Sequence, residues 1–270
     1  MASIMPRNRR ITPTKRLAPQ KPIKGTPGEL IYGFHAVLAA LRNPARKKQH
    51  LWLTQAASMS LAKEGITQTI NVGLEWHPAS NREIDTMLTR GSVHQGLCLA
   101  CTPLSQVSIK EACTPNDGRA PVLLLDQVSD PHNVGAILRS AAAFGVRALV
   151  LQERHSPATT GTLAKAASGA LEITPLVRVS NLARAIHQLK DMGYWLTGLE
   201  TDSKASIEQV SWRHPVALVL GAEGKGLRRL TRANCDSLTA IRLADNMQSL
   251  NVSNAAAIAL HQLQKDRFLF

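Results

Sequence analysis

Residues 216–227 of this chain read VALVLGAEGKGL, an apolar run that ends in a turn with three glycines. Two further polar stretches lie in the same half of the chain, DQVSDPHNVG at 126–135 and SLNVSN at 249–254. Each follows a short apolar run, so each is predicted to be a loop at the carboxyl end of a buried strand. Open parallel sheets bind small molecules at that edge. We therefore expect the three loops to form one composite site.

The segments around these loops alternate between strand-like and helix-like patterns. Strands that are apolar on both faces and separated by helices predict a parallel sheet covered on both sides. The expected fold class is therefore α/β. Strands are expected at 122–125, 148–151, 175–179, 194–199, 216–220 and 240–243, and helices at 134–144, 165–171, between Asn181 and Gly193, and at 255–264.

The N-terminal part of the chain predicts a smaller α/β unit, residues 29–103. Helices are expected at 34–41, 60–63 and 81–88, and strands at 49–53, 73–76 and 96–101. Residues 104–120 are polar, with the turn-forming sequence PNDG at 115–118, and are interpreted as a linker. Residues 121–270 then make up the second domain.

Residues 1–28 hold seven Lys or Arg, five prolines and no acid, which predicts a disordered basic arm. Three interpretations stay open: an arm that contacts phosphates, a solvated tail, and an organelle transit peptide. The prolines disfavour the amphipathic helix of a transit peptide.

The composition limits the possible partners. The 270-residue chain carries a net charge of +13, and a basic surface attracts polyanions, of which nucleic acid is the commonest. No apolar run approaches the length of a membrane span, so no membrane partner is expected.

The four cysteines predict neither a disulfide scaffold nor a metal site. Cys98 and Cys101 form a C-x-x-C pair, but the sequence holds no second pair. The pair also lies in a predicted strand, where positions three apart point to opposite faces. We interpret both as small core or surface thiols and expect no metal.

The glycine-rich turn matches neither of two common nucleotide-binding motifs. Its order, G-x-x-G-x-G from Gly221, differs from the dinucleotide fingerprint, and Lys225 is not followed by Ser or Thr as in a P-loop. Such glycines still indicate special backbone conformations or close approach to a ligand. Asn133 and Ser253 are possible helix caps. Arg139, on a small apolar helix, either reaches the surface or contacts an anion.

Taken together, the three loops resemble the motifs of the SpoU (TrmH-like) family of RNA ribose 2′-O-methyltransferases, which have a trefoil-knotted fold. The motifs occur in the family's order and at similar spacing across 122–263, with RHS at 154–156 and KAASGALE at 165–172 between them. The segment from IYGFHAV at 31–37 to VHQG at 93–96 also resembles a substrate-binding domain. That domain belongs to the subgroup that methylates a guanosine of large-subunit ribosomal RNA.

The resemblance implies a C-terminal knotted parallel-sheet domain that binds S-adenosylmethionine and a small N-terminal α/β domain that binds RNA. It implies a cytoplasmic RNA (ribose-2′-O-)-methyltransferase that forms a homodimer through the knot domain. The positions that it implies for cofactor binding are Leu220, Gly221, Ala222, Gly224, Ile241, Met247, Leu250 and Ser253. Those that it implies for catalysis are Asn133, Arg139, Glu223, Ser249 and Asn251.

The final predicted helix offers a physical reason for a homodimer. Its apolar residues spread over more than the single stripe that one sheet face buries. A two-fold pairing buries a second apolar face with the same patch on both subunits. These residues are Val252, Ala255, Ala256, Ala257, Ile258, Leu260 and Leu263.

The chain departs from the family pattern before the third loop. Residues 241–245 read IRLAD where the family usually has Ile-Pro-Met-x-Gly. Arg242 replaces a proline, and Asp245 replaces a glycine of the kind that adopts a positive φ. The difference bears on the shape of this loop and on cofactor affinity.

The implied reaction is in-line attack of a ribose 2′-hydroxyl on a sulfonium methyl carbon. Arg139 is a poor proton acceptor, because the pKa of an arginine lies above about 12. We interpret it as a clamp on the adjacent phosphate, with Glu223 or water accepting the proton. Three other functions stay open: an RNA-binding or ribosome-assembly protein with an inactive knot domain, a transfer RNA methyltransferase, and a generic nucleotide-binding enzyme. The missing phosphate motifs argue against the last.

Overall fold

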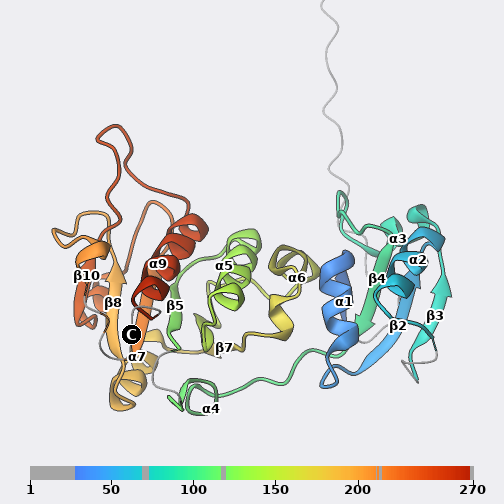
Figure 1. Ribbon diagram of the computed structural model, residues 1–270, viewed down its shortest axis with the longest axis horizontal. Coiled ribbons are helices and arrows are strands. Elements are labelled where there is room, and N and C mark those ends of the chain that lie inside the picture. The colour runs from blue at the N-terminus through green and yellow to red at the C-terminus, as the bar shows by residue number, and fades with distance from the viewer. Residues whose placement is uncertain (1–27, 69–72, 117–119, 211, 213–214, 268–270) are drawn as a thin grey trace, which may run out of the picture.

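The computed structural model describes residues 28–68, 73–116, 120–210, 212 and 215–267. The predicted basic arm lies outside the described residues, apart from Gly28. Figure 1 shows two α/β units next to each other along the long axis, a smaller one around β1–β4 and a larger one around β5–β10.

A six-stranded parallel sheet forms the larger, C-terminal unit, as the sequence predicts. Because each central strand is buried on both faces, its sequence is apolar throughout rather than alternating. In sheet order the strands are β10 (Ser237–Thr239), β8 (Trp195–Leu199), β9 (Val216–Gly221), β5 (Val122–Asp126), β6 (Ala148–Gln152) and β7 (Leu176–Val179).

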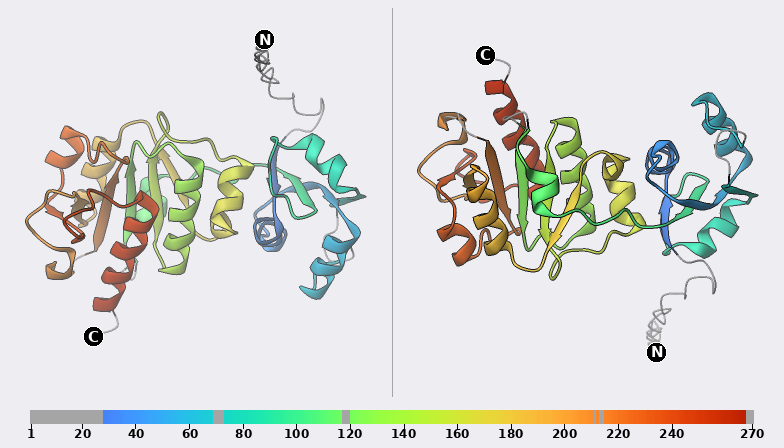
Figure 2. Two further views of the ribbon diagram at one scale, coloured as in Figure 1. Left: turned by 90° about the horizontal axis from the view of Figure 1, so that it is seen from above. Right: turned by 90° about the horizontal axis from the view of Figure 1, so that it is seen from below.

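Helices cover both faces of this sheet, which Figure 2 shows from above and below. Leu123 and Leu125 of β5 share a core with α5 (Pro131–Ala143), α6 (Gly161–Ala167) and α9 (Val252–Arg267). Val122 and Leu124 face the opposite core, which α4 (Ile109–Cys113) and α7 (Leu182–Asp191) cover. Three short helices complete the unit: η1 (Ala170–Glu172), η2 (Ile207–Gln209) and α8 (Arg229–Ala233).

The strand predicted at 240–243 is wrong. The edge strand is β10, and it ends at Thr239 because the backbone there turns to a different partner. The Ala240 amide donates to the Ala205 carbonyl at 2.8 Å, and Ala240 forms a bridge with Ser206 instead of extending along β8. The apolar pattern of 240–243 therefore marks a segment that leaves the sheet.

Two predicted helix starts are also shifted by their caps. The Asn251 side chain, not Ser253, accepts the first free amides of α9, from Ser253 at 2.9 Å and Asn254 at 3.4 Å. The α5 helix begins at Pro131 rather than 134, because Asp130 accepts the His132 amide at 2.9 Å. Asn133 is therefore not a cap and its side chain is free for other contacts.

Two further predictions need correction. The helix predicted at 165–171 is interrupted, because Ser168 adopts a left-handed φ of 51° between α6 and η1. The segment predicted to be a plain linker contains α4, whose Ile109 and Cys113 are buried in the core of the C-terminal unit. This connection is therefore packed against the sheet for part of its length.

The N-terminal unit has a four-stranded mixed sheet in the order β1-β4-β2-β3. β2 and β3 are parallel and the other pairs are antiparallel. The first strand, β1, was not predicted, because its sequence, ELIY, shows no alternation of polar and apolar residues. The elements are β1 (Glu29–Tyr32), α1 (Phe34–Arg42), β2 (Lys48–Leu53), α2 (Gln55–Lys63), β3 (Glu75–Pro78), α3 (Asn81–Met87) and β4 (Leu97–Cys101).

Cys98 and Cys101 are core thiols of β4, since both side chains are fully buried. Burial raises the pKa of Cys98 to about 12 and that of Cys101 to about 11. Both groups are therefore protonated thiols at neutral pH, as is usual for buried structural cysteines.

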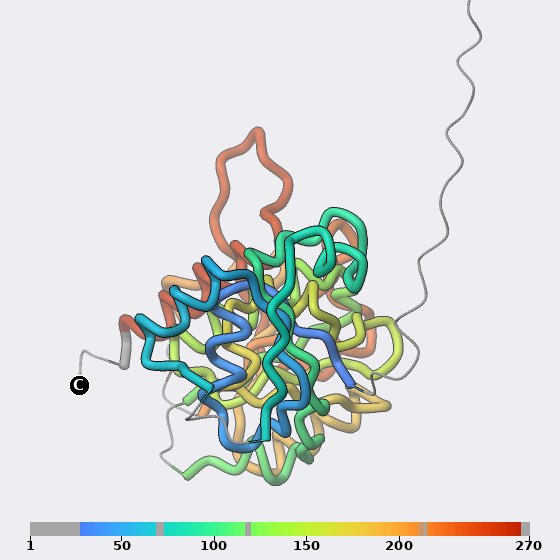
Figure 3. Tube along the Cα trace, turned by 90° about the vertical axis from the view of Figure 1, so that its right-hand side faces the viewer, coloured from blue at the N-terminus to red at the C-terminus, as the bar shows by residue number. Residues whose placement is uncertain are grey.

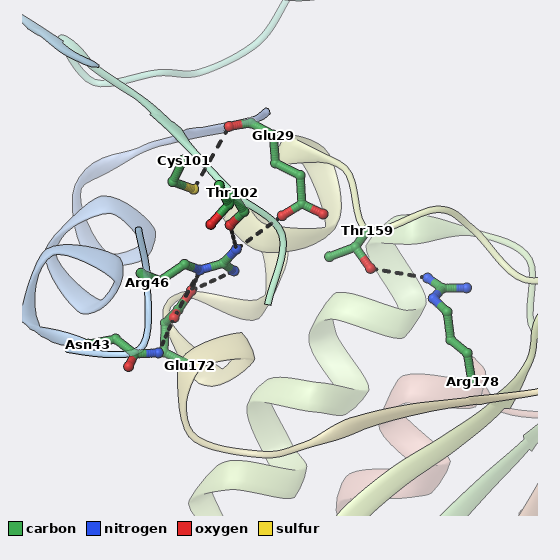
Figure 4. Close-up of polar contacts among 8 residues, drawn as sticks. All are labelled: Glu29, Asn43, Arg46, Cys101, Thr102, Thr159, Glu172 and Arg178. Carbon is green, nitrogen blue, oxygen red and sulfur yellow. Dashed lines mark hydrogen bonds and ion pairs between the residues drawn. The ribbon is translucent and has the colours of Figure 1, made fainter. Parts of the chain in front are cut away.

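A buried ion-pair cluster joins the two units (Figure 4). The Arg46 side chain, after α1, is 1% exposed, and its Nη2 lies 2.9 Å from Glu172 Oε1 of η1. Its Nη1 donates to the Thr102 carbonyl at 2.9 Å and lies 3.2 Å from Glu29 Oε2. Asn43 Nδ2 donates to the other Glu172 oxygen at 2.6 Å. We name this set, Glu29, Asn43, Arg46 and Glu172, the interdomain cluster.

Helix α6 adds a second contact between the units. Lys165 Nζ donates to Gln95 Oε1 at 2.5 Å, and its chain runs over Gly33, where a Cβ would lie 2.4 Å from Lys165 Cδ. Gly161 packs equally closely on the Tyr32 ring, because a Cβ at this position would lie 2.6 Å from Tyr32 Cε1. Buried apolar side chains of both units belong to one continuous hydrophobic core. The two units therefore form one packed body.

Candidate active site

The loops after β5 and β9 lie at the point where the sheet order reverses. From β5 the chain proceeds outward to β6 and β7, and it later returns to place β9 on the other side of β5. Ligands of open α/β sheets bind at such a switch point, outside the carboxyl ends of the strands. A pocket of about 360 Å³ lies here. It is lined by Gln127, Val128, Ser129, Asp130, Asn133, His155, Ala222, Glu223, Lys225 and Val252.

Three predicted site residues, one from each loop, are hydrogen-bonded to one another beside this pocket, and two of them, Asn133 and Glu223, line it. Asn133 Nδ2 donates to Glu223 Oε1 at 3.1 Å, and Asn251 Nδ2 donates to the same oxygen at 2.6 Å. Asn251 Nδ2 also lies 2.9 Å from Asn133 Oδ1, and the Val252 amide donates to Glu223 Oε1 at 3.2 Å. We name Asn133, Glu223 and Asn251 the site triad.

The site triad is a carboxylate held by amides, without a cation. In the described part of the chain, no Lys or Arg forms an ion pair with Glu223. All its hydrogen bonds there converge on Oε1, so Oε2 has no protein donor, and Glu223 itself lines the pocket. An oriented carboxylate oxygen of this kind is able to accept a proton from a bound hydroxyl.

The turn that carries Glu223 is closed by its own backbone. Gly226 N donates to the Ala222 carbonyl at 2.9 Å, and Gly224 adopts a φ of 74°. A Cβ at Gly221 would lie 2.1 Å from the Gly226 carbonyl carbon, so only glycine permits this closure. The glycines thus serve the tight turn that aims Glu223 at the pocket.

An ion pair with one buried partner anchors the same turn and was not predicted from the sequence. Asp126, fully buried at the end of β5, accepts from Arg228 Nε at 2.6 Å and from the Arg228 amide at 3.0 Å. The Asp126–Arg228 pair therefore connects the loop after β5 to the glycine-rich turn after β9. The sequence signal for this pair is a lone acid at the end of an apolar run, together with an arginine after the glycine turn.

Two pocket residues have strained backbones and were also missed. Gln127 and His155 adopt φ values of 62° and 66°. Left-handed conformations in residues other than glycine are uncommon and cluster at functional sites. The sequence marks His155 only as part of the RHS segment, because φ is not visible in a sequence.

The remaining predicted residues do not join the site triad. Arg139 is exposed on α5 and makes no hydrogen bond or ion pair with any described residue. Met247 is 57% exposed, and Ser249 is exposed as well. Both lie in the segment between β10 and α9, which rises above the body of the molecule in Figures 1 and 3.

The residues expected to bind the cofactor lie on the two sides of this segment. Leu220 is buried in β9, which ends at Gly221, and Ala222 and Gly224 lie in the turn that follows. Ile241 and Leu250 are half-buried where the raised segment begins and ends, and Ser253 is half-buried in the first turn of α9. Asp245, which replaces the family's glycine, is exposed and has no positive φ.

Family models match most of the chain. Residues 120–261 match the SpoU rRNA Methylase family. Residues 30–107 match the domain described as RNA 2′-O ribose methyltransferase substrate binding. The two matches fall on the C-terminal and N-terminal units respectively.

Several curated proteins are similar along nearly their whole length. The chain is 36% identical over 240 residues to the 23S rRNA (guanosine-2′-O-)-methyltransferase RlmB of Bordetella pertussis, covering 88% of this chain and 98% of that protein. It is also 36% identical to the RlmB of Pseudomonas aeruginosa, with 88% and 97% covered. An uncharacterized tRNA/rRNA methyltransferase of Synechocystis is 37% identical, and the match covers 88% of this chain and 63% of that protein.

Solved structures share the fold. The SpoU methyltransferase AviRb from Streptomyces viridochromogenes, solved in complex with the cofactor AdoMet, superposes with a TM-score of 0.73 at 20% identity, covering 89% of this chain and 91% of that one. An AdoMet-bound rRNA methyltransferase from Sinorhizobium meliloti gives a TM-score of 0.71 at 22% identity, with 90% and 88% covered.

Among the described residues, no helix is both long and apolar enough to cross a membrane.

Proposed function

Because this chain belongs to the SpoU rRNA methylase family, we propose that it methylates a ribose 2′-hydroxyl of a guanosine in 23S ribosomal RNA, with S-adenosylmethionine as the methyl donor. The RlmB relatives, similar over almost their full length, support this substrate. Such a substrate implies a reaction in the bacterial cytoplasm. The site triad carries the proposal, because it brings one residue of each motif to a single pocket.

The surroundings of the pocket fit S-adenosylmethionine. A volume of about 360 Å³ lies within the range of about 300–1,000 Å³ that is usual for small-molecule sites. The exposed Met247 side chain, in the raised segment, offers apolar surface to a ligand. We assign the contacts to the turn and to both ends of the raised segment: Leu220, Gly221, Ala222, Gly224, Ile241, Met247, Leu250 and Ser253.

In the proposed reaction Glu223 acts as the general base. When bound, S-adenosylmethionine supplies a methyl group activated by a positive sulfur. Asn133 and Asn251 hold Glu223 Oε1, so that Oε2 faces the ribose hydroxyl and accepts its proton. Ser249, at the end of the raised segment, contributes a hydroxyl that orients the sugar.

Arg139 acts on the RNA phosphate rather than on the proton. Its exposed side chain has no described protein partner, so its guanidinium is available to bind a phosphate through two parallel hydrogen bonds. Since Arg139 makes no described hydrogen bond or ion pair with the site triad of its own chain, we propose that it completes the site of a second subunit. The C-terminal domain of that homodimer would be the trefoil knot of the family.

The final helix supports a two-fold pairing. Ile258 is 41% exposed on α9, whereas Ala256, Ala259 and Leu260 of the same helix are buried against the sheet. In a homodimer, mixing Arg139→Ala subunits with Glu223→Ala subunits restores part of the activity that each variant lacks. Sedimentation as a monomer at micromolar concentration, or mixtures with no recovered activity, would contradict the shared site.

The basic arm adds phosphate contacts. Seven cations in residues 1–28 steepen the salt dependence of RNA binding, by roughly 0.7 to 0.9 in slope for each phosphate neutralised. Deleting the arm therefore lowers the slope and leaves cofactor binding intact. Equal slopes for the full and shortened proteins would mean that the arm does not contact RNA.

One experiment tests the activity itself. The protein is incubated with labelled S-adenosylmethionine and ribosomal RNA from cells that lack it, and the methylated nucleotide is mapped. We expect one 2′-O-methylguanosine in 23S RNA. Label in transfer RNA instead would change the substrate, and cofactor binding without any transfer would favour an RNA-binding role.

A further inference from the structure

Two histidines and a glutamate lie together on the outer face of the N-terminal sheet. In the parallel pair β2–β3, His50 is opposite Glu75 and Trp52 is opposite His77. Leu51 and Leu53 of β2 are buried in the core. Since side chains alternate along a strand, His50 and Trp52 point away from that core, toward Glu75 and His77.

The three polar side chains present their ligand atoms to one another. His50 Nδ1 lies 3.1 Å from Glu75 Oε2 and 3.2 Å from His77 Nε2. His77 Nε2 lies 3.6 Å from the same Glu75 oxygen. Ligands about 2.0–2.2 Å from a tetrahedral zinc ion lie about 3.3–3.6 Å apart. The observed triangle therefore has the size of one face of a zinc coordination tetrahedron.

Hydrogen bonding among the three side chains accounts for this triangle less well than a bound cation does. If only one of the two ring nitrogens carries a proton, the edge from the other to the carboxylate oxygen joins two lone pairs; if both carry one, the nitrogen–nitrogen edge joins two protons. A divalent cation at the centre satisfies all three atoms at once. Two imidazoles and a single carboxylate form a ligand set that suits zinc better than magnesium or calcium, which prefer oxygen.

The site is also held in shape before any ion arrives. The Trp52 ring stacks on the His77 ring, with centroids 5.4 Å apart and an interplanar angle of 23°. The His50 ring lies 5.3 Å from that of His77. The His50 and His77 side chains are 33% and 39% exposed, so solvent reaches the open side of the triangle.

We propose that His50 Nδ1, Glu75 Oε2 and His77 Nε2 bind a zinc-class divalent cation, with water in the fourth position. The ion cross-links β3, an edge strand of only four residues, to β2. This departs from the sequence-based prediction of no metal, which weighed only the cysteines. The proposal does not depend on the methyl transfer, and its test does not measure it.

The test is zinc binding by the full-length protein, without a histidine tag and after removal of metal with a chelator. Calorimetry should give one Zn²⁺ per chain, and Co²⁺ in its place should show the strong visible bands of tetrahedral cobalt. His77→Ala and Glu75→Gln should each weaken binding at least about tenfold. Affinity should fall as the pH is lowered, because protons compete with the metal for the imidazole nitrogens.

The control is His187→Ala, which removes an exposed histidine on α7, outside the cluster. It should bind Zn²⁺ like the wild type. The proposal is overturned if the wild type does not bind Zn²⁺, or if His77→Ala and Glu75→Gln bind it as tightly as His187→Ala does. Circular dichroism of each variant shows that lost binding does not reflect a lost fold; if His77→Ala does not fold, Glu75→Gln alone decides.

Discussion

The interdomain cluster and the site triad are both small polar clusters built from distant parts of the chain, yet they differ in charge and burial. In the interdomain cluster a guanidinium with 1% exposure meets a carboxylate with 5% exposure. In the site triad one exposed carboxylate meets two amides, and none of its described contacts is with a cation. The first satisfies its own charges, whereas the second keeps one unpaired beside a pocket.

We interpret this difference as one between a polar cluster that maintains the structure and one that, in the proposed function, acts on a ligand. Burial makes a charge expensive, so a buried charge persists only where a partner of opposite sign is fixed next to it. A solvent-facing carboxylate costs the fold little, and its free oxygen remains available to a substrate. We therefore expect substitutions in the first cluster to reduce stability and those in the second to reduce activity.

The largest effect is expected from Glu172→Gln. This change leaves the buried Arg46 guanidinium without its main counter-charge, which costs about 3–5 kcal/mol in the free energy of unfolding. The matched control is Glu64→Gln, because the Arg42–Glu64 pair has the same 2.9 Å separation but side chains that are 53% and 43% exposed. The control should lose no more than about 1 kcal/mol. Urea unfolding measures both, and equal losses would remove the role given to burial.

Glu223→Ala should have the opposite effect, a large loss of activity with little loss of stability. Methyl transfer should fall by about 10²–10³-fold, the usual effect of removing one group that acts directly on the transition state. The free energy of unfolding should change by no more than about 0.5 kcal/mol, because Asn133 and Asn251 remain able to bond to water. A single-turnover assay and urea unfolding test the two parts. If Glu223→Ala is as unstable as Glu172→Gln, Glu223 has a structural role like that of the interdomain cluster, and the contrast fails.

Asn251 belongs to the site triad and also caps α9, and two substitutions separate these roles. Asn251→Ala removes both and should destabilise the protein by about 1 kcal/mol. Asn251→Ser keeps a side-chain oxygen that caps the helix but loses the amide that holds Glu223. Both variants should lose activity, while only the alanine variant loses stability. Full activity in the serine variant would show that the cap alone matters.

The smallest effect is expected from Glu29→Gln, in the same cluster as Glu172. Burial raises the pKa of Glu29 more than the neighbouring Arg46 lowers it. The folded state therefore holds this proton more tightly than the unfolded state, and the contribution of Glu29 to stability decreases as the pH rises from its ordinary value near 4.5 to the raised one. Glu29→Gln should remove this decrease and change stability at neutral pH by less than about 1 kcal/mol. The measurement is urea unfolding of the wild type and the variant from about pH 4 to about pH 7. The expectation is contradicted if the free energy of unfolding depends on pH equally in both.

The sequence predicted the parts of the fold that depend on local patterns. The strands β5, β6 and β9 were found because strands buried on both faces are apolar throughout. The edge strand β10 was missed because it is polar. Its Ser237 hydroxyl bonds to Thr197 at 3.0 Å, and Thr239 bonds to the Ala205 carbonyl. No hydrophobic period marks such a strand.

The site was predictable as a set of loops but not as a set of contacts. Asn133, Glu223 and Asn251 were found because each stands in a polar turn after an apolar run. The pairs Asp126–Arg228 and Arg46–Glu172 join residues 102 and 126 positions apart, and no local pattern links them. The His50–Glu75–His77 triangle was missed for the same reason, since it depends on the register between β2 and β3.

The continuous core and the packed connection through α4 have one more consequence. A two-domain enzyme with a loose linker searches for its target by swinging one domain toward the other. Here the buried Arg46 pair, the shared apolar core and the anchored connection fix the separation between the N-terminal sheet and the pocket. If the N-terminal unit binds RNA and the pocket modifies it, as proposed, we expect methylation only of RNAs whose own fold spans this fixed separation.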